Sequence, residues 1–292
     1  MKRRPSLSNF VMYFLVSLFA LVCVFPMVLS IIVSFTDEDA ISRNGYAFVP
    51  EKWSIYAYRL IFHGGSSVLR SYGISLFVTA SGTALAVAMT AMAAYTLANK
   101  RVRCRGGLAL FFYVTMVFSA GIVPWYFICR AVGLRNNILS LIVPSLLFNP
   151  FNLFLVKNFM DGIPDSLRES ATIDGASDVR TAFSIYFPLS VPVLATVTLF
   201  YGLAYWNDWW NAIMLIDDKW LYPLQYLLLQ LRSQIRMIRD LQLGAAGGST
   251  ITPPAESIKM ATAVVTIGPI VLLYPYLQRY FIKGLVVGSI KG

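Results

Sequence analysis

The sequence predicts an all-α integral membrane protein with six transmembrane helices and with both termini in the cytoplasm. Of its 292 residues, 57% are apolar and only 13% are charged, and the mean hydropathy is +0.65. Soluble domains average about 25% charged residues. A helix that crosses a hydrocarbon core of roughly 30 Å needs about 20 mostly apolar residues. Six stretches meet this requirement: Phe10–Phe35, Tyr72–Ala98, Gly107–Arg130, Asn137–Val156, Phe187–Ile213 and Ser257–Leu277.

The positions of Lys and Arg orient these helices, because short cytoplasmic loops are enriched in both residues. With the N-terminus inside, more than half of the 24 Lys and Arg residues lie in cytoplasmic segments. They are Lys2, Arg3, Arg4, Lys100, Arg101, Arg103, Arg105, Lys157, Arg168, Arg180, Arg279, Lys283 and Lys291. The net charge of +10 is therefore mainly a signature of topology. No basic patch on a soluble face indicates a nucleic-acid partner.

The first apolar stretch follows a short basic tail, residues 1–9. A signal peptide has an apolar region of about 7–15 residues and a small-residue cleavage site after it. This stretch is much longer and no such site follows it, so we expect a retained transmembrane helix. Residues 10–283 then form one transmembrane domain, and residues 284–292 form a cytoplasmic tail.

The middle helices differ in composition. Tyr72–Ala98 is rich in Ala, Gly, Ser and Thr, and small residues let helix backbones approach closely in lipid. This composition favours either tight packing or the lining of a pathway. The cytoplasmic turn KRVRCR leads to the third stretch. The fourth is interrupted by Pro144 and Pro150, and such breaks are tolerated where protein or water satisfies the freed carbonyls.

The longest outside segment covers about residues 217–256. Its part LYPLQYLLLQLRSQIRMIRDLQLG has helical periodicity with a basic face. The glycine-rich tip GAAGGSTITPPAES follows. Composition allows a surface helix with a mobile loop, or a loop that reaches into a partner protein.

Cysteine and histidine are scarce. The three cysteines Cys23, Cys104 and Cys129 are widely spaced, and His63 is the single histidine. This pattern argues against a disulfide, a zinc site or a histidine-based catalytic centre. We expect no bound metal.

A polar stretch, ESATIDGASDVRTAFSIYFP, separates two apolar runs and faces the cytoplasm in this topology. The Ser166–Glu169 spacing is that of a capping box and predicts a helix that begins at Ser166. Gly175 can end that helix in the left-handed conformation. Ser177 can cap a second short helix that runs to Tyr186, and Pro188 then opens the next transmembrane helix. We therefore expect short cytoplasmic helices at about residues 160–187, between transmembrane helices four and five.

This stretch resembles the EAA motif of the permeases of binding-protein-dependent ABC importers, which reads E-A-A, three residues, G, nine residues and I-x-L-P. Ser170 and Phe187 depart from that pattern by modest changes in size. The form Asp174-Gly175-Ala176, the six-helix layout, the long segment before the last helix and the tail FIKGLVVGSIKG are similar to the carbohydrate branch. Within it the chain resembles the maltose-type second permease subunit, and most of all the subgroup for large oligosaccharides, which includes the alginate importer.

The resemblance implies a transport role without catalysis by this chain. The cytoplasmic segment would dock onto an ATPase subunit, with Glu169 as the charged contact and Gly175 as the bend. The coupling residues would be Glu169, Ser170, Ala171, Asp174, Gly175, Ile185 and Pro188. The outside residues Gly247, Gly248, Ser249 and Thr250 would contact an extracytoplasmic solute-binding protein.

The same resemblance implies the partners and the location. The chain lacks a G-x-x-x-x-G-K-[ST] phosphate loop, so ATP and Mg would be bound by partner subunits. A second permease subunit would complete the pathway, and two ATP-binding subunits would power it. The assembly would lie in the lipid of the bacterial cytoplasmic (inner) membrane.

Aromatic and amide side chains cluster near the end of the fifth stretch. Aromatic residues at a membrane interface often serve as belt anchors, but rings beside amides also suit the binding of sugars. The candidate pathway residues are Tyr201, Tyr205, Trp206, Asn207, Trp209 and Asn211. The carboxylate of Asp208 needs a partner or water there, because an unpaired carboxylate in lipid is costly.

The predicted function is therefore a permease subunit of an ATP-driven oligosaccharide importer, with an acidic, alginate-like sugar as one candidate substrate. One alternative is a permease of an ABC importer for a different small solute. A membrane-embedded transferase would need a cluster of acids or histidines, which the sequence does not offer. A secondary transporter would need charged ion-coupling residues within the membrane, where few are present.

Overall fold

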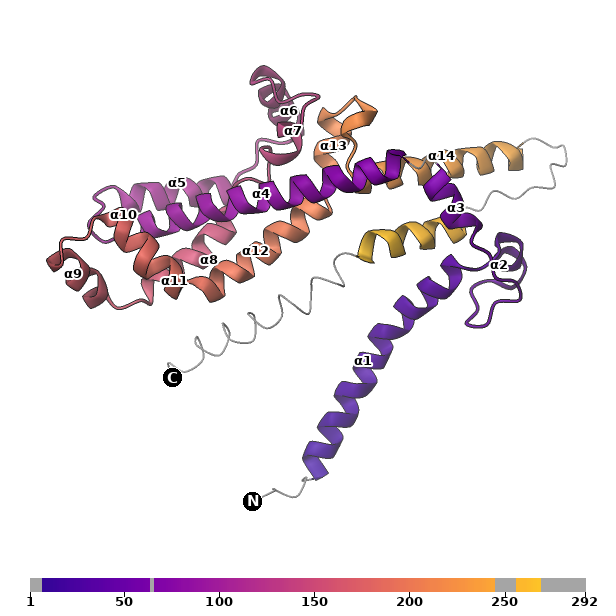
Figure 1. The fold of residues 1–292 in the computed structure, drawn as a ribbon, viewed down its shortest axis with the longest axis horizontal. Coiled ribbons are helices and arrows are strands. Elements are labelled where there is room, and N and C mark those ends of the chain that lie inside the picture. The colour runs from indigo at the N-terminus through magenta and orange to yellow at the C-terminus, as the bar shows by residue number, and fades with distance from the viewer. Residues whose placement is uncertain (1–6, 64–65, 245–255, 269–292) are drawn as a thin grey trace. The chain divides into compact units, whose positions relative to one another are not determined.

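The computed structural model describes residues 7–63, 66–244 and 256–268 (Figure 1). The chain forms two compact units. The first comprises Met1–Val68 with Leu228–Gly268, and the second comprises Leu69–Leu227 with Pro269–Gly292. The described elements of both units are helical, and Thr36 and Trp53 form an isolated β-bridge.

The first unit contains α1 (Leu7–Ser34), α2 (Glu38–Asn44), α3 (Tyr56–His63), most of α14 (Leu224–Gly244) and a helix at residues 256–268. The described part of the second unit begins within α4 (Ser66–Ala98) and ends at the start of α14. Between them lie α5 (Arg105–Val117), α6 (Ile122–Ala131), α7 (Leu139–Ile142), α8 (Pro150–Asp161), α9 (Asp165–Ile173), α10 (Asp178–Thr181), a π-helix (Ala182–Tyr186), α11 (Phe187–Leu189), α12 (Val191–Trp206), α13 (Trp210–Leu215) and a 3₁₀-helix (Lys219–Leu221).

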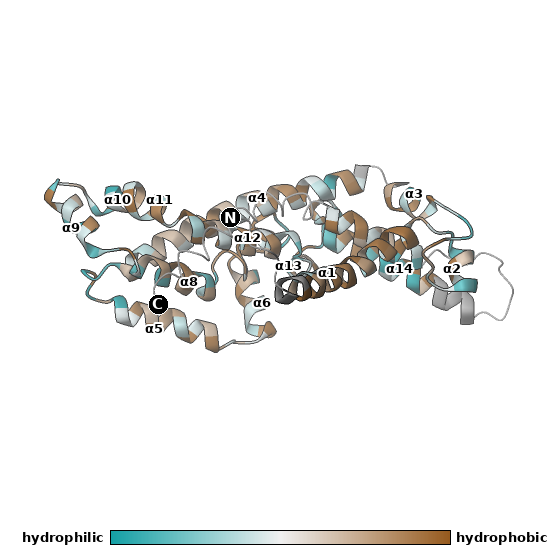
Figure 2. Ribbon diagram, turned by 90° about the horizontal axis from the view of Figure 1, so that it is seen from below, coloured by the Kyte–Doolittle hydropathy of each residue, from teal (hydrophilic) through white to brown (hydrophobic). Residues whose placement is uncertain are grey.

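Two described helices are long and apolar enough to cross a membrane, in the runs Val11–Ser34 of α1 and Ser67–Ala98 of α4. The number rises to four if each of two sharply bent helix pairs is one span. Figure 2 shows α1 as apolar along its length, and its exposed side chains include Phe19 at 71%. A helix with such a surface requires lipid or protein around it. The expected first and second transmembrane helices are therefore present.

The third predicted helix, Gly107–Arg130, is not continuous. The pair α5 and α6 bends by 117° at residues 118–121. Phe118 is extended and Gly121 has a φ of 80°, a value that a right-handed helix cannot contain. Pro124 then lies in the first turn of α6, where proline is tolerated. Hydropathy alone did not reveal this break.

The fifth predicted helix, Phe187–Ile213, is also interrupted. The helical segment Asp178–Leu189 meets α12 at an angle of 81°, so Pro188 lies in the last turn of the first segment and does not open α12. Pro192 in the first turn of α12 has no N–H and clashes with the carbonyl four residues earlier. The preceding helix therefore stops at Ser190. At its other end α12 stops at Trp206, and residues 207–209 precede α13.

Three other expectations about the elements have definite outcomes. The fourth stretch is broken at the predicted prolines, since α7 ends before Pro144, Ser145 has a φ of 65° and α8 starts at Pro150. The predicted fourth transmembrane helix is therefore not among the described helices that are long and apolar enough to cross a membrane. The predicted helix in the long outside segment is confirmed as α14. Of the sixth stretch, residues 257–268 are helical and the remainder lies outside the described residues, as do the tip residues Gly247–Thr250 and the tail 284–292.

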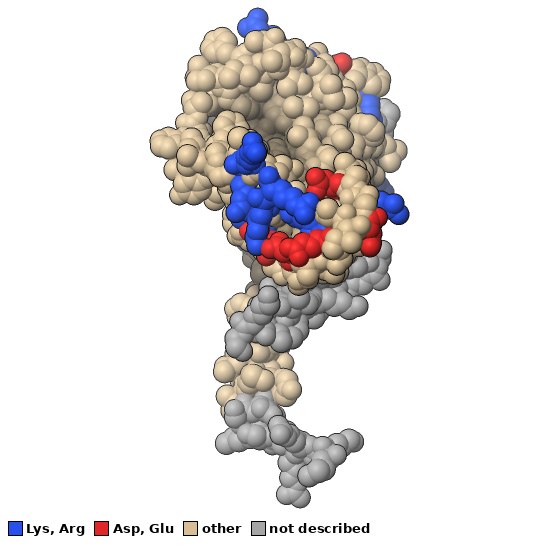
Figure 3. All heavy atoms as spheres, turned by 90° about the vertical axis from the view of Figure 1, so that its left-hand side faces the viewer, with Lys and Arg blue, Asp and Glu red and all other residues tan. Residues whose placement is uncertain are grey.

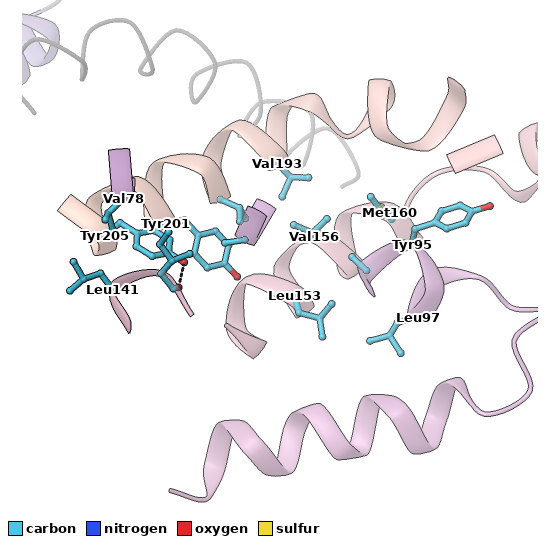
Figure 4. Packing of buried hydrophobic residues seen from close by; sticks show 14 of the residues in the cluster. Val78, Tyr95, Leu97, Leu141, Leu153, Val156, Met160, Val193, Tyr201 and Tyr205 are labelled. Atoms are coloured by element: carbon cyan, nitrogen blue, oxygen red, sulfur yellow. Dashed lines mark hydrogen bonds between the residues drawn. The ribbon is translucent and has the colours of Figure 1, made fainter. Parts of the chain in front are cut away.

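The core of the second unit joins α4 to α8 and α12. Buried residues recur at every fourth position along one face of α4. Larger side chains of α12 pack against that face. The ring of Tyr205 lies so close that a Cβ at Gly82 would be 2.6 Å from it. The hydroxyls of Thr90 and Tyr201 are 2.8 Å apart. Figure 4 shows both tyrosines in this cluster with Val78 of α4 and Leu153 of α8.

In the first unit, Glu38 of α2 caps the helix at residues 256–268. Its carboxylate accepts the N–H groups of Glu256 (3.0 Å) and Ser257 (2.9 Å) and the hydroxyl of Ser257 (2.8 Å). The first N–H groups of a helix have no partner within it, and a negative charge there is stabilising. Tyr46 donates to Glu256 at 2.6 Å, which raises the pKa of Tyr46 to about 12. This capping fixes where the last described helix begins.

The contact between Gly82 and Tyr205 predicts a sharp difference between two glycines of α4. Gly82→Ala should destabilise the protein by about 1–3 kcal/mol, because the buried ring must move to admit a methyl group. Gly73→Ala is the control, since a Cβ there meets nothing within 4 Å. It should be neutral or stabilising by up to about 1 kcal/mol. Thermal unfolding in detergent measures both, and equal shifts in one direction would contradict the packing.

Candidate functional site

The cytoplasmic segment predicted from the polar stretch begins with α9. The helix starts at Asp165 and follows an extended Pro164, which has no side-chain acceptor. The predicted capping box at Ser166 is therefore wrong, because Ser166 already lies within the first helical turn. Asp165 instead places a negative charge at that end, where the helix dipole favours it.

The predicted stop at Gly175 is confirmed. Gly175 has a φ of 74°. Its N–H donates to the carbonyl of Thr172 (3.1 Å), and the N–H of Ala176 donates to the carbonyl of Ala171 (2.9 Å). These two bonds form a Schellman motif, which depends on a left-handed residue at that position. The bend direction of the segment is thus set by one glycine.

The second short helix also begins where the sequence predicts. Ser177 accepts the N–H of Arg180 at 3.2 Å and caps α10. The chain then widens into a π-helix at Ala182–Tyr186. This form is rare in proteins, and where it occurs it is frequently at a functional site. It continues through α11 to Leu189, three residues beyond the predicted end at Tyr186. The two short helices lie on either side of the Gly175 bend.

The predicted coupling residues divide by exposure. Glu169, Ser170, Asp174, Gly175 and Pro188 are exposed, Ile185 is half-buried, and Ala171 is buried. Two exposed apolar side chains were not singled out from the sequence, Ile173 (86%) and Val179 (68%). Figure 3 shows Lys and Arg gathered beside Asp and Glu at the end that carries α9. This end combines charges with exposed apolar groups, a composition suited to a protein partner.

Arg168 holds α9 against the base of α4. Its side chain is only 4% exposed. One guanidinium N–H donates to Oδ1 of Asn99 at 2.5 Å, and the guanidinium carbon lies 4.7 Å and 5.3 Å from the ring centroids of Tyr186 and Tyr95. No carboxylate within the described part of the chain forms an ion pair with it. Two aromatic faces and one amide therefore compensate in part for the burial of a cation, and Nε of Arg168 is buried without a hydrogen-bond partner in the described chain.

Weaker contacts support the same attachment. Lys100 forms an ion pair with Asp165, and this hydrogen bond holds the pKa of the Asp165 carboxyl below its usual range. Arg101 donates to the hydroxyl of Thr172 at 3.3 Å. These groups are exposed, and exposed ion pairs contribute little. The buried Arg168 is therefore the main attachment.

Sequence reasoning missed the role of Arg168 and counted it only as a cytoplasmic positive charge. A signal was present, because Arg168 and Ala171 are three residues apart and share one helix face. Both are buried. The aromatic partners Tyr95 and Tyr186 come from distant parts of the sequence, so the pattern of α9 alone does not identify them.

Most of the candidate pathway residues are packed in the interior of the second unit. Tyr201, Tyr205 and Trp206 are 2–5% exposed. The Tyr201 hydroxyl accepts the N–H of Asn149 at 3.0 Å, and Tyr205 donates to the carbonyl of Ile142 at 2.8 Å. These hydroxyls tie α12 to the broken segment around α7 and α8. The assignment of these tyrosines to a pathway remains a prediction.

The polar candidates after α12 have mixed surroundings. Asn207 and Trp209 are exposed, and Asn211 is 1% exposed and donates to the carbonyl of Pro144 at 3.1 Å. Asp208 accepts the N–H groups of Trp210 and Asn211 at 3.1 and 3.2 Å. Oδ2 of Asp208 and Oδ1 of Asn211 are buried without a hydrogen-bond partner in the described chain. Such atoms are suited to bind water or a sugar hydroxyl.

No metal-binding cluster occurs in the residues that the structure describes: no three His, Cys, Asp or Glu side chains are placed to hold an ion. The tip residues Gly247, Gly248, Ser249 and Thr250 lie outside the described residues. The described part of the site therefore consists of the α9–α11 segment and the buried polar groups around α12.

Comparison with known proteins gives consistent results. No family model matches the chain. It is 37% identical over its full length to the complete Polygalacturonan/rhamnogalacturonan transport system permease protein YtcP of Bacillus subtilis. It is also 37% identical, over 93% of this chain and 90% of the relative, to Protein LplC of the same organism.

One solved structure is similar in both fold and sequence. It is a bacterial ABC transporter involved in the import of the acidic polysaccharide alginate. The TM-score is 0.80 and the identity is 27%, over 96% of this chain and 100% of the solved chain.

The role of Arg168 predicts a local effect of its removal. In Arg168→Met, amide exchange across residues 166–176 should accelerate roughly ten- to a hundredfold, because a hydrogen bond from a charged donor contributes about 1.5–3 kcal/mol. Arg180→Met is the control, since Arg180 is exposed in the same segment. Hydrogen–deuterium exchange read by mass spectrometry measures this, and unchanged protection in Arg168→Met would refute the attachment.

Proposed function

The chain belongs to the permeases of carbohydrate ABC transport systems, and from that premise we propose that it is one membrane-spanning subunit of an ATP-driven oligosaccharide importer. The observation that carries the proposal is the exposed helix–glycine–helix segment that bends at Gly175, attached to α4 through a buried arginine. The chain is an integral membrane protein and a transport subunit without an enzymatic role. In the proposed topology, six helices cross the bacterial cytoplasmic membrane and both termini are cytoplasmic.

The α9–α11 segment is the proposed docking site for an ATP-binding subunit. Its exposed groups include the carboxylate of Glu169 and the apolar side chain of Ile173. A charged contact with an apolar neighbour gives both orientation and affinity at an interface. Gly175 fixes the angle between the two helices, so the docked segment has one shape.

Movement of the docked segment is transmitted through Arg168. Because its guanidinium lies against Tyr95 of α4 and Tyr186 of the π-helix, α9 cannot shift without moving both elements or breaking these contacts. Closure of the ATP-binding subunits would then tilt α4 and α12 as a rigid body. Alternating access by such rigid-body movement is a common transport mechanism.

The proposal requires four further components. A second permease subunit completes the pathway, two ATP-binding subunits bind ATP and Mg, and an extracytoplasmic solute-binding protein delivers the sugar. The segment around Gly247–Thr250 is the proposed contact with that binding protein. The tail 284–292 is proposed to reach the ATP-binding subunits.

An acidic oligosaccharide is the proposed substrate class. Support comes from the names of two similar proteins, one a transporter of polygalacturonan and rhamnogalacturonan and the other an importer of alginate. The half-buried Asp208 and the buried Asn211 offer acceptor atoms for sugar hydroxyls. These two side chains would bind the neutral part of a sugar, since a carboxylate would repel Asp208.

The test is to purify the tagged chain from gently solubilised membranes of its own cell and to identify its partners by mass spectrometry. The wild-type chain should retain a second permease and an ATP-binding subunit. Glu169→Lys should keep the permease but lose the ATP-binding subunit by at least about tenfold, because reversal of an interfacial charge costs several kcal/mol. The control Glu51→Lys alters an exposed acid far from α9 in sequence and should retain both. Absence of any ATP-binding subunit from the wild-type complex would contradict the function.

A further inference from the structure

Among the residues that the structure describes, Arg70 of α4 has no anionic partner. Its guanidinium carbon lies 3.8 Å from the ring centroid of Trp220, and among the described residues it forms no ion pair or hydrogen bond. Its Nε is buried and unsatisfied. Arg70 also lies near the N-terminal end of a 33-residue helix, where the helix dipole disfavours a cation. A bound anion would accept the hydrogen bond that Nε lacks and would offset the unfavourable interaction of Arg70 with the helix dipole.

The neighbouring carboxylates are already engaged. Asp217 forms an ion pair with Arg135 at 2.9 Å, and Asp218 accepts the N–H of Trp220 at 2.9 Å. Neither aspartate forms an ion pair with Arg70. An anion that pairs with Arg70 would therefore come from outside the described part of this chain.

The loop that carries Trp220 is held in place. Oδ1 of Asn136 accepts the N–H groups of Asp217 (3.2 Å) and Asp218 (2.8 Å), and the N–H of Asn136 donates to the carbonyl of Leu215 (2.7 Å). Trp220 nevertheless remains 67% exposed. An indole with one face on Arg70 and a large exposed surface is thus fixed on a rigid support, as a binding subsite requires.

We propose that Arg70 and Trp220 form a subsite for the uronate sugars of an acidic oligosaccharide, at the extracytoplasmic end of α4. The guanidinium binds the sugar carboxylate, because its planar donors match a carboxylate in a bidentate fork. The exposed indole surface packs against the apolar C–H face of the same sugar ring. This inference rests on the proposed function, and it assigns recognition of the acidic group to residues away from Asp208.

A phospholipid phosphate is the other source of an anion at a membrane surface, and arginine also binds phosphate. Trp residues are moreover enriched at the membrane interface. The sugar is favoured here because two similar proteins are named for acidic polysaccharides. The experiment must therefore separate the two sources.

The test uses the assembled transporter in phosphatidylcholine nanodiscs and saturation-transfer difference NMR. The probes are trigalacturonate, trimannuronate and the methyl ester of each. The wild type should bind at least one free acid, and Arg70→Gln should weaken that binding about tenfold, the equivalent of 1.4 kcal/mol, while leaving the methyl ester unaffected. Trp220→Leu should weaken both forms. Arg59→Gln, at an exposed arginine of α3, should change neither.

Two outcomes would overturn the subsite. They are no binding of any uronate by the wild type, and equal binding of the free acid by the wild type and Arg70→Gln, which would leave lipid phosphate as the anion at Arg70. ATP hydrolysis stimulated by the solute-binding protein is measured on every sample. If it persists while the subsite fails, the proposed function stands. If it is absent in the wild type, the proposed function itself fails.

Discussion

The fold of the end that carries α9 depends on the burial of one cation. Removing a guanidinium from water is costly unless its donors and its charge are compensated. For Arg168 part of that compensation comes from two tyrosine rings and the amide of Asn99, which belong to the end of α4, the turn after it and the π-helix. The three elements must therefore keep their mutual positions, or the charge is left uncompensated.

From this point a set of contacts continues along α4 as far as Gly82. Tyr95 joins Arg168 to α4, and α4 then meets α12 where Thr90 bonds to Tyr201 and where Gly82 admits the ring of Tyr205. Because close-packed interiors transmit displacement, we infer that α4 and α12 move together. The small residues of α4 thus serve packing, and the broken helices around them supply the polar groups near Asp208.

Local rules explain why some features were predictable from the sequence and others were not. The stop at Gly175 follows from the backbone preference of a single residue, and α4 follows from an apolar run without breakers. The bend before Pro192 and the break at Gly121 were missed, because hydropathy measures how apolar a stretch is and carries no information on its direction. The role of Arg168 was missed because its partners are distant in sequence, and only tertiary structure brings them together.

The central claim is that α9 and α4 move as one body, and a distance measurement between spin labels tests it most directly. The labels are placed at Leu167 of α9 and Leu85 of α4, both exposed, in an assembled transporter whose native cysteines have been replaced. We predict the same distance distribution with and without trapped ATP, and a shifted or broadened one in Arg168→Met. A wild-type distance that changes between the nucleotide states would contradict the account.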